Sequence, residues 1–417
     1  MLFWGLLYQW ASVSIQVIYC NIMGIPLNDL FKNTVFPSEL LVYTDFLSIT
    51  GLYVFNLGIY LPLRRLKIVI PETAWDKYDP KKILQVYIVV SLIINASQIA
   101  IWNFPSLVQY FFFLFYIKWG FFIVTFIVIF KRAPDLKVFL YIVIIIEFIL
   151  GLSSFFASSF IIILLFSLIA YSAVNKRISY GQGVLFTVMV GLLFHMAVLW
   201  TASKGRYRTY LNQGQMGQAV KVSKDEARAK LLELIVKVDA TTYNNAIEDM
   251  INRVGYIQYF AAAIRFVPAR IPFEDGRIYL AAISHYFVPR FINPDKPVLD
   301  DSKHTNKYTG LGVSGRERAT SFSLGCFADA YIDFGPVFMF IPIFLFGYMV
   351  GYFYKFLHRR TIWGLIFTSP FFLLINIYGA DTTKALGFIL IYFMVMAVLG
   401  KYIRDVIDPT MIRRTLI

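Results

Sequence analysis

The chain has 417 residues, of which 58% are hydrophobic and only 15% charged, and its mean hydropathy is +0.64. Soluble domains carry roughly 25% charged residues, so this composition excludes an ordinary soluble enzyme and indicates a membrane protein. The net charge of +14 lies largely in clusters beside apolar segments, where it orients the protein and meets anionic lipid. We therefore expect no nucleic-acid partner, and Cys20 and Cys326 provide no disulfide framework.

Ten segments are long and apolar enough to be membrane-spanning helices, which need about 20 mainly apolar residues. The first follows Met1 with no basic leader, so we expect a retained anchor. The predicted spans are residues 2–23, 42–63, 83–103, 107–130, 135–152, 155–174, 182–202, 335–355, 362–379 and 385–403. The sequence thus predicts an all-α polytopic fold with a bundle at 1–203, a non-membrane segment at 204–334 and a second bundle at 335–417.

Basic residues cluster at every second connection between these spans. The clusters are Arg64, Arg65, Lys67, Lys81 and Lys82, then Lys131 and Arg132, Lys176 and Arg177, Lys355, His358, Arg359 and Arg360, and finally Lys401 and Arg404. Connections rich in Lys and Arg stay in the cytoplasm. This alternation predicts a multi-pass protein of the cytoplasmic membrane with both termini inside and 204–334 outside.

Few ionisable residues lie within the predicted spans, and a charge in lipid is costly enough to suggest a function. They are Asp45, Lys118, Glu147, His195, and, at an outer edge, Asp381 and Lys384. A structural alternative stands beside three of them, namely an ion pair between Lys118 and Glu147 and a hydrogen bond between helices for His195. Gly347 and Gly351 form a GxxxG pattern that predicts close helix packing.

The predicted outer segment contains two helical patterns. Residues 225–238 follow Ser223, a plausible N-cap, and begin with acidic residues. Residues 243–266 place apolar side chains at helical spacing, and Arg253 falls only about 60° from the middle of that stripe at 100° per residue. Pro268 and Pro272 end the pattern.

The second half of the segment combines rigid, mobile and basic parts. In His285 to Asp301 the prolines 289, 294 and 297 restrict the backbone, so we expect a stiff loop that holds Arg290 and Lys296. The Gly/Ser/Thr-rich stretch that begins at His304 is expected to be mobile. Arginines outnumber lysines there, and their planar guanidinium groups suit phosphate; a surface that touches lipid headgroups is the alternative.

Common catalytic signatures are absent from the sequence. There is no HExxH, GxGxxG, GxxxxGK[ST] or GxSxG pattern. The four histidines, His195, His285, His304 and His358, are too widely spaced to indicate a metal site. The first outer connection has only Asp29 and Glu39, without the Asp-x-Asp pattern of metal-dependent transferases. We therefore expect chemistry without a metal or cofactor.

Two motifs and the order of the segments resemble a known family. "VPRFINPDKP" at 288–297 is similar to a proline-rich run of oligosaccharide repeat-unit polymerases, the Wzy type, and "DAYIDFG" at 329–335 is similar to their run that leads into the next span. The chain has Asp329 and Asp333 where the family pattern has Glu and Asn. The order of spans, a long late outer segment and a few closing spans also resembles the related O-antigen ligases.

The resemblance implies a GT-C-like helical fold and a metal-independent, inverting glycosyl transfer. The donor would be a glycan on polyprenyl diphosphate, and the acceptor a sugar hydroxyl of a second lipid-linked repeat unit. Membrane lipid, a chain-length regulator and a flippase would be further partners. The candidate catalytic residues are His285 and Asp329. The candidates for binding the diphosphate are Arg253, Arg265, Arg290, Arg270, Arg277 and Lys296.

Three other functions remain open at this point. An O-antigen-type ligase would use the same donor with a different acceptor. A polysaccharide transporter or flippase predicts internal repeats or broken helices, and we find no repeat in the sequence. A structural subunit without chemistry is the third alternative.

Overall fold

The computed structural model of the chain describes residues 2–31, 36–66, 70–101, 115–152, 158–174, 179–215, 220–287, 299–315, 321–375 and 379–413. Within these ranges the secondary structure is helical, apart from one isolated bridge between Tyr78 and Ile412. This confirms the predicted all-α class. The chain forms two compact units, one of residues 1–70, 97–117 and 251–404, and one of residues 71–96, 118–250 and 405–417.

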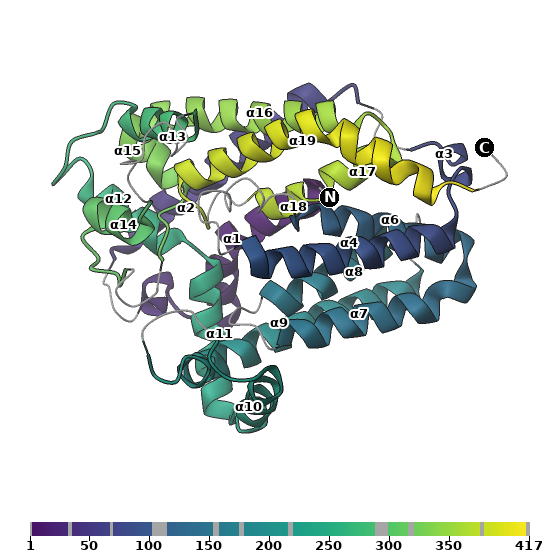
Figure 1. Cartoon of the computed structure of the whole chain (residues 1–417). Helices are drawn as coiled ribbons and strands as arrows, with labels where there is room; N and C mark the ends of the chain where they lie inside the picture. Colours follow the sequence, from purple (N-terminus) through teal and green to yellow (C-terminus); the bar gives the residue numbers. More distant parts are fainter. Residues whose placement is uncertain are drawn as a thin grey trace. The chain divides into compact units, whose positions relative to one another are not determined.

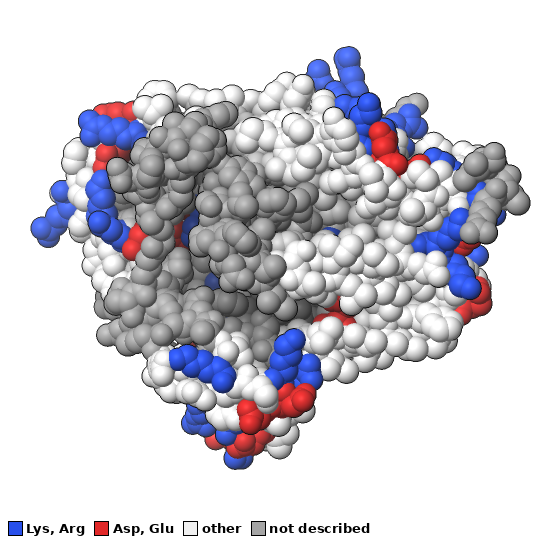
Figure 2. All heavy atoms as spheres, in the orientation of Figure 1, with Lys and Arg blue, Asp and Glu red and all other residues white. Residues whose placement is uncertain are grey.

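Four of the described helices are long and apolar enough to cross a membrane. They are α2 (Ser38–Leu63), α9 (Tyr180–Leu211, with the apolar part from Gly183), α16 (Phe340–His358) and α19 (Thr382–Met411). Figure 2 agrees, because the described surface along α16 and α19 is mainly white, while blue and red atoms gather near helix ends. The protein is therefore a helical membrane protein. The predicted span 362–379 is not one continuous helix, because α17 ends at Thr368, before Pro370, and α18 ends at Leu374.

The first unit contains the N-terminal helices, the C-terminal apolar helices and the second half of the predicted outer segment. Its helices are α1 (Leu2–Met23), η1 (Leu27–Leu30), α2, α12 (Ile257–Phe266), α13 (Arg277–Phe287), α14 (Asp301–Thr309), α15 (Cys326–Phe338), α16, α17 (Ile362–Thr368), α18 (Phe371–Leu374) and most of α19. Figure 1 shows the short helices α12 to α15 grouped at the end where α16 and α19 begin.

Glycines allow α2 and α16 to pack with their backbones in contact. A side chain added at Gly347 would overlap the carbonyl of Phe55, and one at Gly351 would overlap the carbonyl of Ile59. This confirms the close packing predicted from the GxxxG pattern. On its other side α16 packs on α19, where the rings of Phe353 and Phe393 stack with centroids 3.8 Å apart. The three helices form a firm support for the short helices at their ends.

The second unit contains a group of helices that lie side by side, among them α4 (Pro80–Ile101), α7 (Lys137–Leu152), α8 (Ser158–Val174) and α9 (Figure 1). Its other described elements are α3 (Thr73–Asp76), α6 (Ile117–Arg132), η2 (Pro134–Leu136), α10 (Lys224–Val236) and the first part of α11 (Ala240–Val254). Aromatic contacts join neighbours, such as the stacked rings of Trp119 and Phe166 at 4.9 Å. Lys118 and Glu147 form the predicted ion pair at 2.6 Å, and His195 bonds Tyr243 at 2.8 Å.

In the predicted outer segment, one helix was predicted correctly, and two separate helices were predicted as one. Helix α10 begins after Ser223, whose hydroxyl accepts from the Glu226 N–H in a capping box, as predicted. The predicted helix 243–266 is wrong as a single element, because α11 ends at Val254 and α12 begins at Ile257. The break lets Gly255 lie directly against the side chain of Gln16, which would have to shift to make room for a larger residue.

The stretch from His304 was expected to be mobile, and this expectation is wrong for its beginning. Residues 301–309 form α14, with Asp300 as N-cap and Gly310 in the left-handed conformation at its end. Side chains of the helix bond the chain that follows, including Thr305 to the carbonyl of Phe322 at 2.7 Å. The predicted stiff loop, with its three prolines, lies mostly at 288–298, outside the described residues.

Candidate functional site

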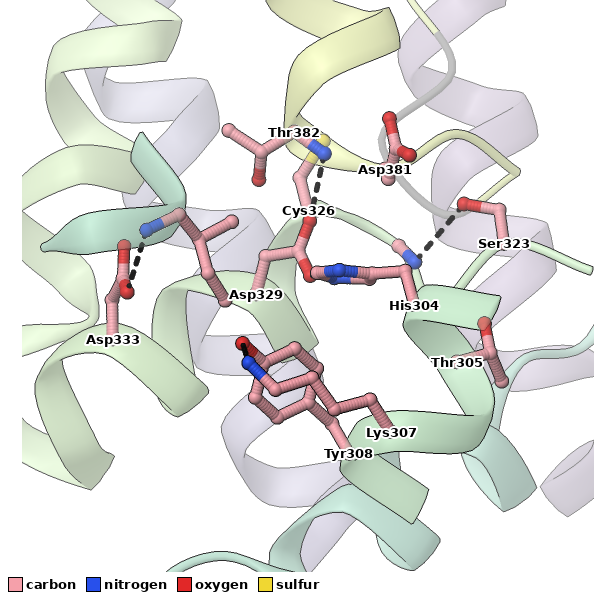
Figure 3. A network of polar contacts seen from close by, with 12 residues as sticks. His304, Thr305, Lys307, Tyr308, Ser323, Cys326, Asp329, Asp333, Asp381 and Thr382 are labelled. Carbon is pink, nitrogen blue, oxygen red and sulfur yellow. Dashed lines mark hydrogen bonds and ion pairs between the residues drawn. The ribbon is translucent and has the colours of Figure 1, made fainter. Parts of the chain in front are cut away.

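Three helices bring polar side chains together in the first unit. Figure 3 shows His304 of α14, Asp329 of α15 and Asp381, the residue before α19. Helix α14 also supplies Asp301, and the first turn of α19 supplies Lys384. Asp301, Asp329 and Asp381 are all buried, with exposed fractions of 4%, 0% and 7%. Buried carboxyl groups are costly without partners, so their arrangement defines the candidate site.

His304 and Asp329 form the centre of this arrangement. The Nε2 atom of His304 lies 2.7 Å from Oδ1 of Asp329. The second oxygen of Asp329 accepts the backbone N–H of Thr382, at 2.8 Å. Because both oxygens of Asp329 act as acceptors, its carboxylate holds the imidazole with Nε2–H as the donor. Nδ1 is then left as the nitrogen that can accept a proton, and about a quarter of the His304 side chain remains exposed.

The charges around His304 change its basicity. Burial on its own lowers the pKa of His304, but the charge and hydrogen bond of Asp329 raise it, with smaller contributions from Asp381 and Asp301. The net result is a pKa above the ordinary value of 6.5. His304 is therefore a stronger base than a free imidazole, and it takes up a proton more readily near neutral pH.

Asp301 and Lys384 form an ion pair beside this centre. Ser321 donates a second hydrogen bond to the same Asp301 oxygen, Oδ2, at 2.7 Å. Burial raises the pKa of Asp301, but the Lys384 ammonium outweighs it and the pKa falls below the ordinary value. The pair thus keeps a negative and a positive charge at the edge of the site.

Asp381 has the most perturbed carboxyl group of the site. Burial raises its pKa to about 7, and the charges of Asp329 and Asp301 act in the same direction. Its Oδ1 accepts the backbone N–H of Lys384 at 2.7 Å, which opposes the shift. A carboxyl group that titrates near neutral pH, beside a basic histidine, is a recurrent property of catalytic sites.

A second polar group lies one helical turn along α14. Lys307 Nζ and the Tyr308 hydroxyl each lie 2.8 Å from the same oxygen of Glu274. The exposed Arg277 guanidinium is 3.7 Å from the other oxygen. The Tyr308 ring meets His304 edge-on at 4.9 Å, so the two groups are in contact.

The structure places the predicted catalytic residues differently. Asp329 is fully buried at the centre, whereas His285 lies half-buried in the last turn of α13. The imidazole bonded to Asp329 belongs to His304, which sequence reasoning had considered only as a metal ligand. Asp333, the other acid of the motif at 329–335, is buried, and it accepts the N–H groups of Ile278 and Tyr279 and so caps α13.

The predicted phosphate-binding residues are spread along the segment. Arg253, Arg265, Arg270 and Arg277 have exposed side chains, and the guanidinium of Arg265 lies 5.2 Å from the ring centre of Phe36. Arg277 is connected to the site through Glu274 and Tyr308. Arg290 and Lys296 lie outside the described residues. Their predicted role is therefore not tested by the geometry.

One signal in the sequence points to His304. Asp300 and Gly310 bound nine residues that can form a short helix with a standard N-cap and C-terminal glycine. In such a helix Asp301 and His304 lie three residues apart and share a face. The low apolar content of the stretch conceals this pattern from a search for hydrophobic periodicity.

These features define a class of protein, a helical membrane protein with a buried histidine–carboxylate centre beside the ends of its apolar helices. The family model described as "Domain of unknown function (DUF8712)" matches residues 48–358, and the chain belongs to that family. The matched part includes Asp301, His304 and Asp329, and ends before Asp381 and Lys384. No curated protein and no solved structure matches the chain.

Proposed function

We propose that the protein is a membrane glycosyltransferase that polymerises oligosaccharide repeat units carried on polyprenyl diphosphate. The observation that carries the proposal is the buried Asp329–His304 pair, since sugar transfer to a hydroxyl needs a positioned base. Exposed arginines in the same segment supply the cations that a diphosphate donor requires. The choice of repeat-unit polymerisation as the reaction comes from the motif resemblance at 288–297 and 329–335.

The proposal includes ten spans, a GT-C-like fold and a site at the outer face of the cytoplasmic membrane. Contacts within the second unit support this orientation. Lys131 lies 3.3 Å from Glu72, and Arg132 pairs with Asp76, so two basic connections predicted to be cytoplasmic meet. Lys77 pairs with Asp408 at 2.7 Å, which brings the chain's C-terminal part to the same place.

In the proposed reaction His304 is the base for the acceptor hydroxyl. Nδ1 takes the hydroxyl proton as the oxygen attacks the anomeric carbon of the donor sugar. The bond between that carbon and the diphosphate oxygen breaks, and its electron pair leaves with the lipid diphosphate. Attack from the face opposite the leaving group inverts the anomeric configuration. Asp329 holds the imidazole and stabilises the imidazolium that forms.

Departure of the leaving group depends more on electrostatic stabilisation of its negative charge than on protonation. A diphosphate already carries negative charge, so fixed cations near its oxygens stabilise the charge that builds up as the bond breaks. Arg277, with Arg253, Arg265, Arg270, Arg290 and Lys296, forms the proposed set. Arg277 is connected to the site through Glu274.

A polymerisation assay with purified protein tests the proposal. The protein should lengthen lipid-linked oligosaccharide without nucleotide sugar and with a chelator present. His304→Gln should remove turnover, with a loss of about 10²-fold or more, and Arg277→Lys should reduce it by loss of the planar fork. His195→Gln is the matched control, because His195 bonds Tyr243 in the other unit.

The result also distinguishes the alternatives. An O-antigen-type ligase would consume the same donor only when its own glycolipid acceptor is supplied. Normal polymerisation by His304→Gln would reject His304 as the base, and His285→Ala in the same series tests the base predicted from sequence. If the donor is not consumed with either the lipid-linked repeat unit or the glycolipid as acceptor, the proposed function is refuted. Transport and a structural role in assembly are then the remaining alternatives.

A further inference from the structure

Three aromatic side chains lie in a row near the carboxylates of the site. The ring centres of Tyr256 and Tyr259 are 5.5 Å apart, with the planes at 45°. The ring of Phe322 is 6.2 Å from that of Tyr259, at 44°. All three side chains are half-buried, so they keep accessible surface while being held by the protein. We call Tyr256, Tyr259 and Phe322 the aromatic row.

The aromatic row is joined to the helix that carries His304. The backbone N–H of Phe322 donates to the Ser302 hydroxyl at 3.1 Å, and its carbonyl accepts from Thr305 at 2.7 Å. The preceding residue, Ser321, bonds Asp301. The Asp301 charge also contributes to raising the pKa of Tyr256, after the larger effect of burial. The row therefore borders the same site, from the side of α12.

Polar groups flank the row at the junction of α11 and α12. Gln16 is fully buried and donates to the side-chain oxygens of Asn252 and Gln258, at 3.1 and 3.0 Å. Gln258 in turn donates to the Asn252 carbonyl at 3.0 Å. These bonds fix the turn that presents the next group, Arg253.

Arg253 lies in the last turn of α11, three residues before Tyr256, and its side chain is exposed. Burial raises the pKa of Tyr256 and of Tyr259, and the charge of Arg253 acts against burial at both phenols. The accessible rings thus have a cationic hydrogen-bond donor on the neighbouring turn of the chain. Aromatic rings with a few placed polar groups are the usual lining of a site for an organic ligand.

We propose that the aromatic row and Arg253 bind a sugar ring of the acceptor glycan. A pyranose ring has an apolar face of C–H groups, which packs on aromatic rings, and an edge of hydroxyls, which bond charged and polar groups. The inference rests on the proposed function for the identity of the glycan. A sugar held there lies beside α14, the helix that carries His304.

Binding of free sugar chains tests this inference separately from turnover. The probe is the oligosaccharide mixture that mild acid releases from the lipid fraction of the producing cell, added to the detergent-solubilised full chain and detected by native mass spectrometry. Tyr256→Ala and Tyr259→Ala should weaken binding by about tenfold. Tyr259→Phe keeps the ring and should stay within about twofold of the wild type.

Controls separate binding from folding and from chemistry. Tyr180→Ala changes a tyrosine with 90% exposure at the start of α9 and should bind normally. His304→Gln should bind normally while losing turnover. Thermal unfolding of each variant shows which proteins are folded, and binding by the wild type remains a test if the alanine variants are not.

Each outcome decides one of the two claims. No binding by the wild type at millimolar oligosaccharide overturns the inference, and so does unchanged binding by folded Tyr256→Ala and Tyr259→Ala; polymerisation can still proceed in either case. Weakened binding by those variants, together with an inactive wild type in the polymerisation assay, supports a glycan site and rejects the proposed function.

Discussion

Replacing Asp329 with Asn should change both the acidity and the orientation of His304. In the wild type, Oδ2 of Asp329 accepts the Thr382 N–H and Oδ1 faces Nε2 of His304. An asparagine that keeps the Thr382 bond must turn its NH₂ group toward His304. Nε2 then has to act as the acceptor, so the neutral imidazole carries its proton on Nδ1 and loses the proposed base.

The size of the effect follows from the bond that is lost. A hydrogen bond to a charged group contributes about 1.5–3 kcal/mol, and one pKa unit corresponds to about 1.36 kcal/mol. Asp329→Asn should therefore lower the pKa of His304, because the charge and hydrogen bond of Asp329 are what raise it in the wild type. The base must be neutral, so wild-type activity rises with pH through a His304 pKa above 6.5, and this acidic limb should move to lower pH in the variant. The maximal rate should fall by about 10²-fold or more.

Two measurements check this prediction. The pH–rate profile of polymerisation reports the acidic limb, and histidine-selective NMR titration reports His304 without any assumption about function, since the chain has only four histidines. Asp333→Asn is the matched control on the same helix, because Asp333 bonds the backbone of Ile278 and Tyr279. An unchanged His304 titration in folded Asp329→Asn would refute the reasoning.

Three further predictions concern topology, packing and the buried acid. Cysteine at the exposed Lys303 should react with an impermeant reagent on intact cells and cysteine at Lys81 should not, with little background because both native cysteines are buried; the reverse pattern would invert the proposed orientation. Gly347→Leu should lower the free energy of unfolding by about 1–3 kcal/mol, measured by thermal unfolding, while Gly191→Leu, with open space around it, should not. Asp381 binds its proton more tightly in the folded protein, where burial raises its pKa from 3.8 to about 7, so this group costs stability as pH rises through that range. Asp381→Asn should raise the melting temperature most at about pH 8 and least near pH 4, and an equal shift at both would contradict the assignment.

The sequence predicted those features that depend on composition and on local pattern. Apolar length predicted the helical membrane class, and the Ser223 cap predicted the start of α10. Gly347 and Gly351 predicted a close helix pair because small residues are what such a contact requires. Asp329 was identified as a candidate by its motif, and the structure buries it fully with one oxygen bonded to His304.

The sequence could not show which histidine meets Asp329. Helix α14 is held by bonds from its polar side chains to the following chain, such as Ser302 to the carbonyl of Ser314 at 2.9 Å and Asn306 to that of Val313 at 2.8 Å. Such bonds leave no hydrophobic period to detect. The break between α11 and α12 was missed for a similar reason, since it depends on Gln16, more than two hundred residues away.

The two acids of α15 couple the positions of two other helices. Asp329 holds His304 on α14, and Asp333, one helical turn later, accepts the first N–H groups of α13. A shift or rotation of α15 would therefore move the start of α13 and the imidazole of His304 together. A substitution that disturbs the packing of α15 should for this reason be detected at both helices, even where it lies far from either acid.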